Sequence, residues 1–159
     1  MREILFRGKR KDTGELVSSG NLITFNDEGE GKQFFIPQMN AKCTCTHDEQ
    51  DNIISFDSGM FYKVDPDTVG QFTGLTDKNG KRIFEGDIGR YIQTDGAKRN
   101  GNPVICIGKV VYNAKTASFA VESKDESGCK YFDYFPIKDF VVIGNIHDNP
   151  ELLEGDRDG

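Results

Sequence analysis

Residues 72–84 read FTGLTDKNGKRIF, and this stretch decides the fold class. Two short apolar segments, Phe72–Leu75 and Ile83–Phe84, flank a polar turn that contains Asn79 and Gly80. Asn-Gly tolerates the positive φ angles of a tight turn, so the stretch predicts a β-hairpin. The same alternation of a short apolar segment and a turn cluster recurs in both directions along the chain.

Short segments rich in β-branched and aromatic residues predict strands on both sides of this hairpin. Toward the C-terminus they are Ile88–Thr94, Val104–Tyr112, Phe119–Ser123, Lys130–Ile137 and Phe140–Ile146. Toward the N-terminus they are Ile4–Arg7, Leu16–Phe25 with a break at Gly20, Phe34–Pro37, Ile53–Phe56 and Met60–Val64. Gly108, inside one of the longer segments, predicts a bulge or a bend.

These segments predict an all-β protein with two subdomains. Residues 1–70 form an irregular N-terminal β subdomain. Residues 71–155 form a small SH3-like or twisted β-barrel, because about five strands follow one another at a spacing of about 8–12 residues. A short helix is expected at the end of this barrel, followed by a tail of residues 156–159.

The helix prediction rests on three neighbouring residues. Asn149 is a suitable cap, Pro150 fits the first helical position, and Glu151 favours the positive end of the helix dipole. Leu152 and Leu153 are then expected to dock on the barrel.

The composition excludes several classes of protein. Among 159 residues, 12 Phe and 5 Tyr argue against disorder. The apolar runs are too short for a transmembrane helix. The first residues lack the apolar core of a signal peptide, so we expect a reducing compartment and free thiols for the four cysteines. The net charge of −6 disfavours binding of nucleic acid or anionic lipid by the overall charge of the protein. Binding by a local basic patch is still compatible with this charge.

The dense basic cluster is Arg7, Lys9, Arg10 and Lys11. Alternation along a strand would place Arg7, Lys9 and Lys11 on one face, beside an aromatic residue. Basic groups interleaved with aromatics can hold phosphates and stack bases. The alternative interpretation is a solvated turn, because a turn sequence follows directly.

The segment 130–135 reads KYFDYF and is aromatic on both faces of an extended strand. Tyr131 and Tyr134 are the candidate binding residues in it. An exposed aromatic face would provide a surface for self-association or for a partner. Burial on both faces is equally compatible with the pattern.

Two further patterns suggest chemistry only weakly. Cys43, Cys45 and His47 would share one face of a strand, but the spacing is shorter than that of a structural zinc site and a fourth ligand is needed. Glu85 and Asp87 offer a carboxylate pair, but Asp in such a turn more often bonds the local backbone N–H groups. We therefore predict no metal site and no catalytic residue, and leave a small enzyme as a third class.

Three blocks of sequence resemble the YopX-like family of phage and prophage proteins. They are Arg2–Arg7 with the Thr13-Gly14 turn, Val64–Leu75 running on to Ile88, and Val142–Leu153. The resemblance implies a mostly β, phage-encoded protein of the bacterial host cytoplasm, and it carries no established activity. The chain departs from the family at Gly8–Arg10 and at Lys42–Ile54, so the basic cluster and the Cys-Thr-Cys-Thr-His pattern inherit no role.

At four positions in these blocks a glycine indicates that the backbone needs an unusual φ or that another group approaches it closely. They are Gly74, Gly80, Gly86 and Gly144.

The leading functional hypothesis is a non-enzymatic protein-binding or assembly module that self-associates or binds a host or phage protein. The alternative is a nucleic-acid-binding accessory protein that uses the basic N-terminal cluster. No cofactor and no membrane partner is implied.

Overall fold

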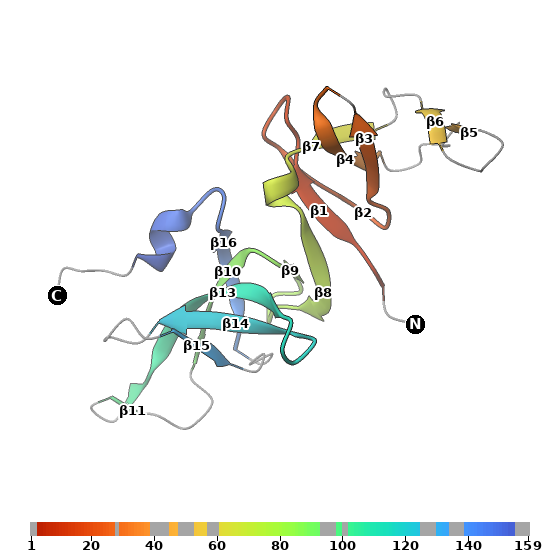
Figure 1. The fold of residues 1–159 in the computed structure, drawn as a ribbon. Helices are drawn as coiled ribbons and strands as arrows, with labels where there is room; N and C mark the ends of the chain where they lie inside the picture. The colour runs from red at the N-terminus through yellow and green to blue at the C-terminus, as the bar shows by residue number, and fades with distance from the viewer. Residues whose placement is uncertain are drawn as a thin grey trace. The chain divides into compact units, whose positions relative to one another are not determined.

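The computed structural model describes residues 3–27, 29–38, 45–47, 53–56, 61–92, 98–99, 102–124, 130–133 and 139–154. The contacts divide the chain into two compact units, Met1–Gln71 and Phe72–Gly159. Both units are built from β-strands (Figure 1), which confirms the predicted all-β class. Strand β8 (Gly70–Thr76) contains the boundary between the two units.

The first unit contains two antiparallel sheets and a short ribbon. In one sheet β1 (Phe6–Lys9) pairs with β2 (Leu16–Ser19) and, on its other side, with the first two residues of β8. The other sheet has the order β3 (Ile23–Asp27), β4 (Gly31–Pro37) and β7 (Phe61–Val64). The ribbon pairs β5 (Cys45–His47) with β6 (Ile53–Phe56). The break that the sequence predicted at Gly20 separates β2 from β3.

The end of β1 is joined closely to β7. Ile36 and Val64 are fully buried, and Val64 lies 3.1 Å from the position that a Cβ on Gly8 would occupy. The backbone N–H of Lys11 donates to the carbonyl of Lys63 at 2.9 Å. This junction places the segment that follows β1 against the middle of β7. One of the two candidate functional sites of the protein lies at this junction.

The second unit begins with the predicted hairpin. The later residues of β8 pair with β9 (Arg82–Phe84) across a turn in which Gly80 has a φ of 82°. The backbone N–H of Gly80 donates to the carbonyl of Asp77 at 2.9 Å. The hairpin prediction is therefore confirmed, with the positive φ carried by Gly80 and not by Asn79.

A five-stranded antiparallel sheet makes up most of the second unit and curls into a half-barrel. Its order is β15 (Lys130–Asp133), β14 (Ser118–Lys124), β13 (Ile105–Asn113), β10 (Asp87–Ile92) and β16 (Val141–Asn145). A separate two-stranded ribbon pairs β11 (Lys98–Arg99) with β12 (Asn102–Pro103).

The core of this unit lies on the concave side of the half-barrel. It contains Ile83, Tyr91, Cys106, Val110, Val121, Phe140 and Val142. The rings of Tyr91 and Phe140 stack with their centroids 6.2 Å apart. The Tyr91 hydroxyl and the Ser123 hydroxyl are hydrogen-bonded at 2.8 Å, which satisfies both polar groups inside the core.

Of the bulge or bend predicted at Gly108, the bulge is wrong. The register of β13 with β10 runs through Gly108 without a shift, Gly108 pairs directly with Gly89, and the regular pairing with β14 begins at Gly108. The irregularity lies in the pairing of β10 with β16, between Ile88 and Gly89. Gly108 is required for space: a Cβ there would meet the Ser123 hydroxyl at 2.3 Å and the backbone carbonyl of Glu122 at 2.8 Å.

The predicted terminal helix is a single 3-10 turn, η3 (Pro150–Leu153), preceded by a second such turn, η2 (Pro66–Thr68), in the first unit. Pro150 takes the first helical position as predicted, but Asn149 makes no side-chain cap hydrogen bond. Its side-chain oxygen lies over Gly144 instead, 2.6 Å from the position of a Cβ, and Leu152 lies beside it at 2.9 Å. The close approach predicted at Gly144 is thus confirmed, and Leu152 docks on the sheet. Within the described part of the chain, no helix is long and apolar enough to cross a membrane.

Candidate functional site

The convex side of the half-barrel exposes a cluster of isoleucines, which we call the isoleucine face. Side chains alternate along β10 and β13, so Tyr91 and Cys106 enter the core while Ile92, Ile105 and Ile107 point to the opposite side. Ile105 is 60% exposed, Ile107 41% and Ile92 38%. Ile92 and Ile105 are direct partners in the register, so the three side chains form one surface.

Among the described residues, the turn η3 covers the other end of the same side of the sheet. There Ile88 pairs with Gly144, over which Leu152 of η3 lies, and Ile88 is fully buried. Antiparallel sheets commonly keep one face solvated and polar, whereas the outer side of this sheet is apolar at Ile92, Ile105 and Ile107. Single exposed isoleucines are ordinary, but a contiguous group of them marks an interaction surface.

Two charged residues border the isoleucine face. Arg90 is exposed and stands in the register between Ile107 on β13 and Val141 on β16. Asp139 is exposed and precedes Val141 by two residues. Neither side chain forms an ion pair with another described residue. Lys109, two residues beyond Ile107 on the same side of β13, pairs with Glu122 at 3.5 Å. Arg90 and Asp139 are therefore the cation and the anion near the face that have no ion-pair partner among the described residues.

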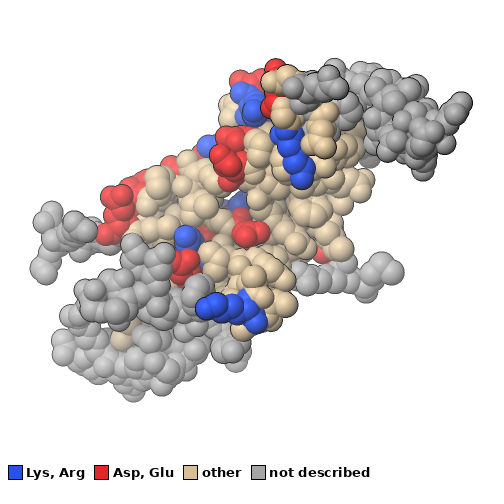
Figure 2. Space-filling model, viewed as in Figure 1, with Lys and Arg blue, Asp and Glu red and all other residues tan. Residues whose placement is uncertain are grey.

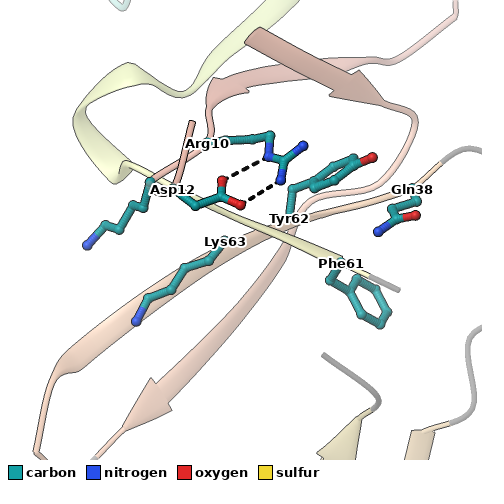
Figure 3. Close-up of a pocket in the computed structure, with 7 residues that line it drawn as sticks. Arg10, Asp12, Gln38, Phe61, Tyr62 and Lys63 are labelled. Carbon is teal, nitrogen blue, oxygen red and sulfur yellow. Dashed lines mark hydrogen bonds and ion pairs between the residues drawn. The ribbon is translucent and has the colours of Figure 1, made fainter. Parts of the chain in front are cut away.

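A second candidate site is a cleft of about 390 Å³ in the first unit, which we call the Arg10 cleft. It lies where the turn after β1 meets β7 and the end of β4 (Figure 3). Its lining residues are Arg10, Lys11, Asp12, Gln38, Phe61, Tyr62 and Lys63.

The guanidinium of Arg10 is held in a fixed orientation in this cleft. Its Nε donates to Oδ1 of Asp12 at 2.9 Å and its Nη2 to Oδ2 at 2.6 Å. The guanidinium carbon lies 4.2 Å from the ring centroid of Tyr62 (Figure 3). The hydrogen bond with Asp12 raises the pKa of Arg10, and the same hydrogen bond lowers the pKa of Asp12. Arg10 is therefore a charged, planar group with its edge taken up by a carboxylate.

The other cations of the basic cluster have different places. Arg7 and Lys9 belong to β1 and do not line the cleft. Because β1 ends at Lys9, Lys11 leaves the strand and joins Arg10 at the cleft instead of sharing a face with Arg7 and Lys9. Lys11 is exposed, and none of the described carboxylates pairs with its ammonium group. Lys63 pairs with Glu30 at 2.6 Å.

Of the remaining predicted positions, three lie in described strands (Tyr131, Cys45 and His47) and two lie outside the described residues (Tyr134 and Cys43). Tyr131 is part of β15, where its backbone pairs with Ser123, and Tyr134 lies outside the described residues. Cys43 also lies outside them. Cys45 and His47 are in β5, whose register with β6 shifts between Thr46 and His47. No group of three metal-ligating side chains occurs among the residues that the structure describes.

The two carboxylates in and after the hairpin serve the backbone. Oδ2 of the buried Asp87 accepts the N–H of Phe84 at 2.8 Å, as predicted for an Asp in a turn. Asp77 accepts from Asn79 and Lys81 in its own turn and from Val142 of β16. These hydrogen bonds give both carboxylates a structural role.

Sequence reasoning missed the isoleucine face and half of the Arg10 cleft. The segment 105–108, ICIG, has no polar residue at alternate positions. This pattern predicts that the strand is apolar on both of its sides over this segment. Tyr62 and Lys63 are about fifty residues from Arg10 in the sequence, and no local pattern connects them.

Comparison with known proteins places the chain in a family. The model of the YopX protein family matches residues 5–154, which is most of the chain. The chain belongs to the YopX family.

The YopX match includes every residue of the isoleucine face and of the Arg10 cleft. Among solved structures, the crystal structure of protein EF1440 from Enterococcus faecalis is similar, with 26% sequence identity over 94% of this chain and 97% of that chain and a TM-score of 0.48. No curated protein matches this YopX-family chain.

Proposed function

We propose that this YopX-family chain is a non-enzymatic protein-binding and assembly module that self-associates through the isoleucine face. The observation that carries the proposal is the adjacency of Ile92, Ile105 and Ile107 on a sheet whose other side already holds the core. We expect the module to act in the cytoplasm of a bacterium that carries the phage gene, as the family resemblance implies.

The apolar area on this face favours association. Burying an isoleucine side chain that is fully exposed contributes about 1.5–3 kcal/mol. Three isoleucines that are between 38% and 60% exposed therefore offer a few kcal/mol per copy, before the cost of association. An interface of this kind is expected to be reversible and dependent on concentration.

The charges at the border favour a second copy of the chain as the occupant. A two-fold interface uses the same patch on both copies, so the patch must be complementary to itself. Arg90 and Asp139 supply one charge of each sign next to the same apolar surface. In a two-fold pair, Arg90 of one copy can meet Asp139 of the other.

The test is the molar mass in solution as a function of concentration, measured by light scattering after size-exclusion chromatography. The double variant Ile105→Ser, Ile107→Ser is expected to remain folded, because both side chains are largely exposed, and to become a monomer. The matched control is Ile4→Ser, because Ile4 is 54% exposed in the first unit. A wild-type chain that is monomeric at all concentrations, or a double variant that associates as the wild type does, would overturn the proposal.

Charge reversal tests the choice of partner. Arg90→Asp and Asp139→Arg are each expected to weaken association, because each places like charges opposite one another in the pair. The double reversal Arg90→Asp, Asp139→Arg is expected to restore association, since opposite charges meet again. Additive losses in the double variant would show that these two residues do not meet across the interface.

The alternative function, binding along a nucleic-acid backbone through the basic cluster, has less support. Arg10 is already paired with Asp12, and Lys63 with Glu30. Among the described residues on the face drawn in Figure 2, acidic and basic side chains are interspersed and form no continuous basic stripe. A track that follows many phosphates needs such a stripe.

A further inference from the structure

We propose that the Arg10 cleft binds one phosphorylated nucleoside, with the base stacked on the Arg10 guanidinium and the phosphate held by Lys11. This inference is independent of self-association, because the cleft and the isoleucine face belong to different units. It requires a pocket for a single nucleotide and no extended basic track.

The stacking platform is already assembled. Tyr62 lies under the Arg10 guanidinium at 4.2 Å, and the two hydrogen bonds to Asp12 fix the rotation of its plane. The Arg10 side chain is 20% exposed, and it lines the cleft. Nucleobases stack on arginine planes as they do on aromatic rings, and a plane that is fixed in advance loses little side-chain entropy when the base arrives.

The charges in the cleft favour an anion beside the stacked group. The lining contains three cations, Arg10, Lys11 and Lys63, and one carboxylate, Asp12. Arg10 pairs with Asp12 and, at 3.9 Å, with Glu15, and Lys63 pairs with Glu30, so the charges of Arg10 and Lys63 are balanced near the cleft and Lys11 is the cation with no described partner. A phosphate carries between one and two negative charges at neutral pH, and a lysine ammonium is a compact partner for it.

The size of the cleft fits a small ligand. Its volume of about 390 Å³ lies at the lower end of the range of about 300–1,000 Å³ typical of small-molecule sites.

Two kinds of ligand offer a base next to a phosphate: a free mononucleotide and one nucleotide of a single strand. Both present a planar base next to a phosphate, and the experiment below separates them.

The experiment is a set of titrations of the full chain at low salt, followed by calorimetry. The probes are adenosine 5′-monophosphate, adenosine, inorganic phosphate and a single-stranded deoxyadenosine oligonucleotide of about ten residues. Adenosine 5′-monophosphate is expected to bind at least tenfold more tightly than adenosine or inorganic phosphate alone, because only it engages both Arg10 and Lys11. An oligonucleotide that binds more tightly than the monophosphate indicates a single strand as the source, and equal or weaker binding indicates the free nucleotide.

Two variants separate the two contacts. Lys11→Ala is expected to weaken the monophosphate about tenfold and to leave adenosine unchanged, because it removes the phosphate contact. Arg10→Lys keeps the charge and removes the plane, so it is expected to weaken the monophosphate and adenosine but not inorganic phosphate. The matched control is Lys115→Ala, which removes another exposed lysine, from a turn of the second unit.

Several results would overturn the nucleotide site. They are an absence of binding at millimolar monophosphate, equal affinity for monophosphate and inorganic phosphate, or equal losses in Lys11→Ala and Lys115→Ala. The self-association variants Ile105→Ser, Ile107→Ser are expected to bind the monophosphate as the wild type does. A failure of either proposal is therefore visible separately from a failure of the other.

Discussion

At the scale of single residues, Asp77 connects two distant parts of the second unit. The residue is 6% exposed, and its Oδ1 accepts the backbone N–H groups of Asn79 at 2.8 Å and Lys81 at 2.9 Å. Its Oδ2 accepts the N–H of Val142 in β16 at 3.1 Å. One carboxylate thus closes the hairpin turn and holds the turn against an edge strand of the main sheet.

The substitution Asp77→Asn tests this connection. The amide oxygen can replace Oδ1, but the amide NH₂ would then face the N–H of Val142, donor against donor. We expect a loss of about 1–3 kcal/mol in the free energy of unfolding, measured by urea denaturation at neutral pH. An unchanged midpoint would show that the carboxylate does not hold the turn to β16.

The same residue predicts a dependence of stability on pH. Burial by itself raises the pKa of Asp77, but the hydrogen bonds from Lys81, Val142 and Asn79 and the charge of Lys81 outweigh it, so the pKa lies below the ordinary value of 3.8. A carboxyl group with a lowered folded-state pKa binds its proton more readily when unfolded. Its stabilisation is complete above the unfolded-state pKa and is lost as the pH falls through the folded-state value.

We therefore expect the gap in unfolding free energy between the wild type and Asp77→Asn to be constant near neutral pH. The gap should narrow as the pH falls below about 4, the unfolded-state pKa of Asp. Urea midpoints of both proteins, measured from pH 7 down to pH 3, give this comparison. A gap that widens in acid would contradict the lowered pKa.

At the scale of elements, the main sheet is built around a pair of glycines. Gly89 of β10 and Gly108 of β13 are direct partners, and the ring of the fully buried Phe140 lies over Gly89. A Cβ on Gly89 would be 2.0 Å from Cζ of Phe140. The missing Cβ on Gly89 leaves room for the Phe140 ring against the backbone of the sheet, and the missing Cβ on Gly108 leaves room for the side chains of Ser123 and Val121.

The substitution Gly89→Ala is expected to destabilise the second unit. The ring of Phe140 cannot turn away, because it is enclosed by the core and stacked on Tyr91. Overpacking of this kind costs about 1–3 kcal/mol, which thermal denaturation can measure. The control is Gly20→Ala, at an exposed position where the nearest atom to a Cβ is the carbonyl oxygen of Ile4 at 3.6 Å. A loss of stability no larger than that of the control would mean that Phe140 moves aside freely.

The local elements followed from the sequence to within a few residues. Val104–Tyr112 became β13, Ile105–Asn113, and the segment Leu16–Phe25 divided at Gly20 as expected. The terminal helix shortened to one 3-10 turn, because the Asn149 side chain lies over Gly144 and makes no cap hydrogen bond. Turn residues and the alternation of polar and apolar residues involve neighbours in the sequence, so they can be predicted from a short segment. The contact between Asn149 and Gly144 depends instead on the position of strand β16.

At the scale of the whole molecule, each unit has a buried core of its own. In the first unit the described residues Ile36, Phe61 and Val64 are buried, and in the second the buried cluster lies around Tyr91 and Phe140. We therefore expect that a substitution which creates a cavity among the buried residues of one unit destabilises that unit more than the other.

The variants Ile36→Ala and Val110→Ala test this prediction by amide hydrogen exchange. Each is expected to cost about 1–5 kcal/mol through the lost side chain and the cavity, and to raise exchange mainly in the unit that contains it. Equal acceleration in both units for either variant would show that the chain opens as one cooperative block.

The all-β class, the central hairpin and most strands could be predicted from the amino-acid sequence, because short-range patterning and turn chemistry carry that information, and three sequence blocks indicated the family. Three features depend on tertiary contacts: Ile92, Ile105 and Ile107 form one exposed surface, Arg10 lies on Tyr62, and Asp77 accepts from Val142. Each of these features joins residues from different segments of the chain. Strand pairing and register bring such residues together, and they are set by the packing of the whole unit and not by any single segment.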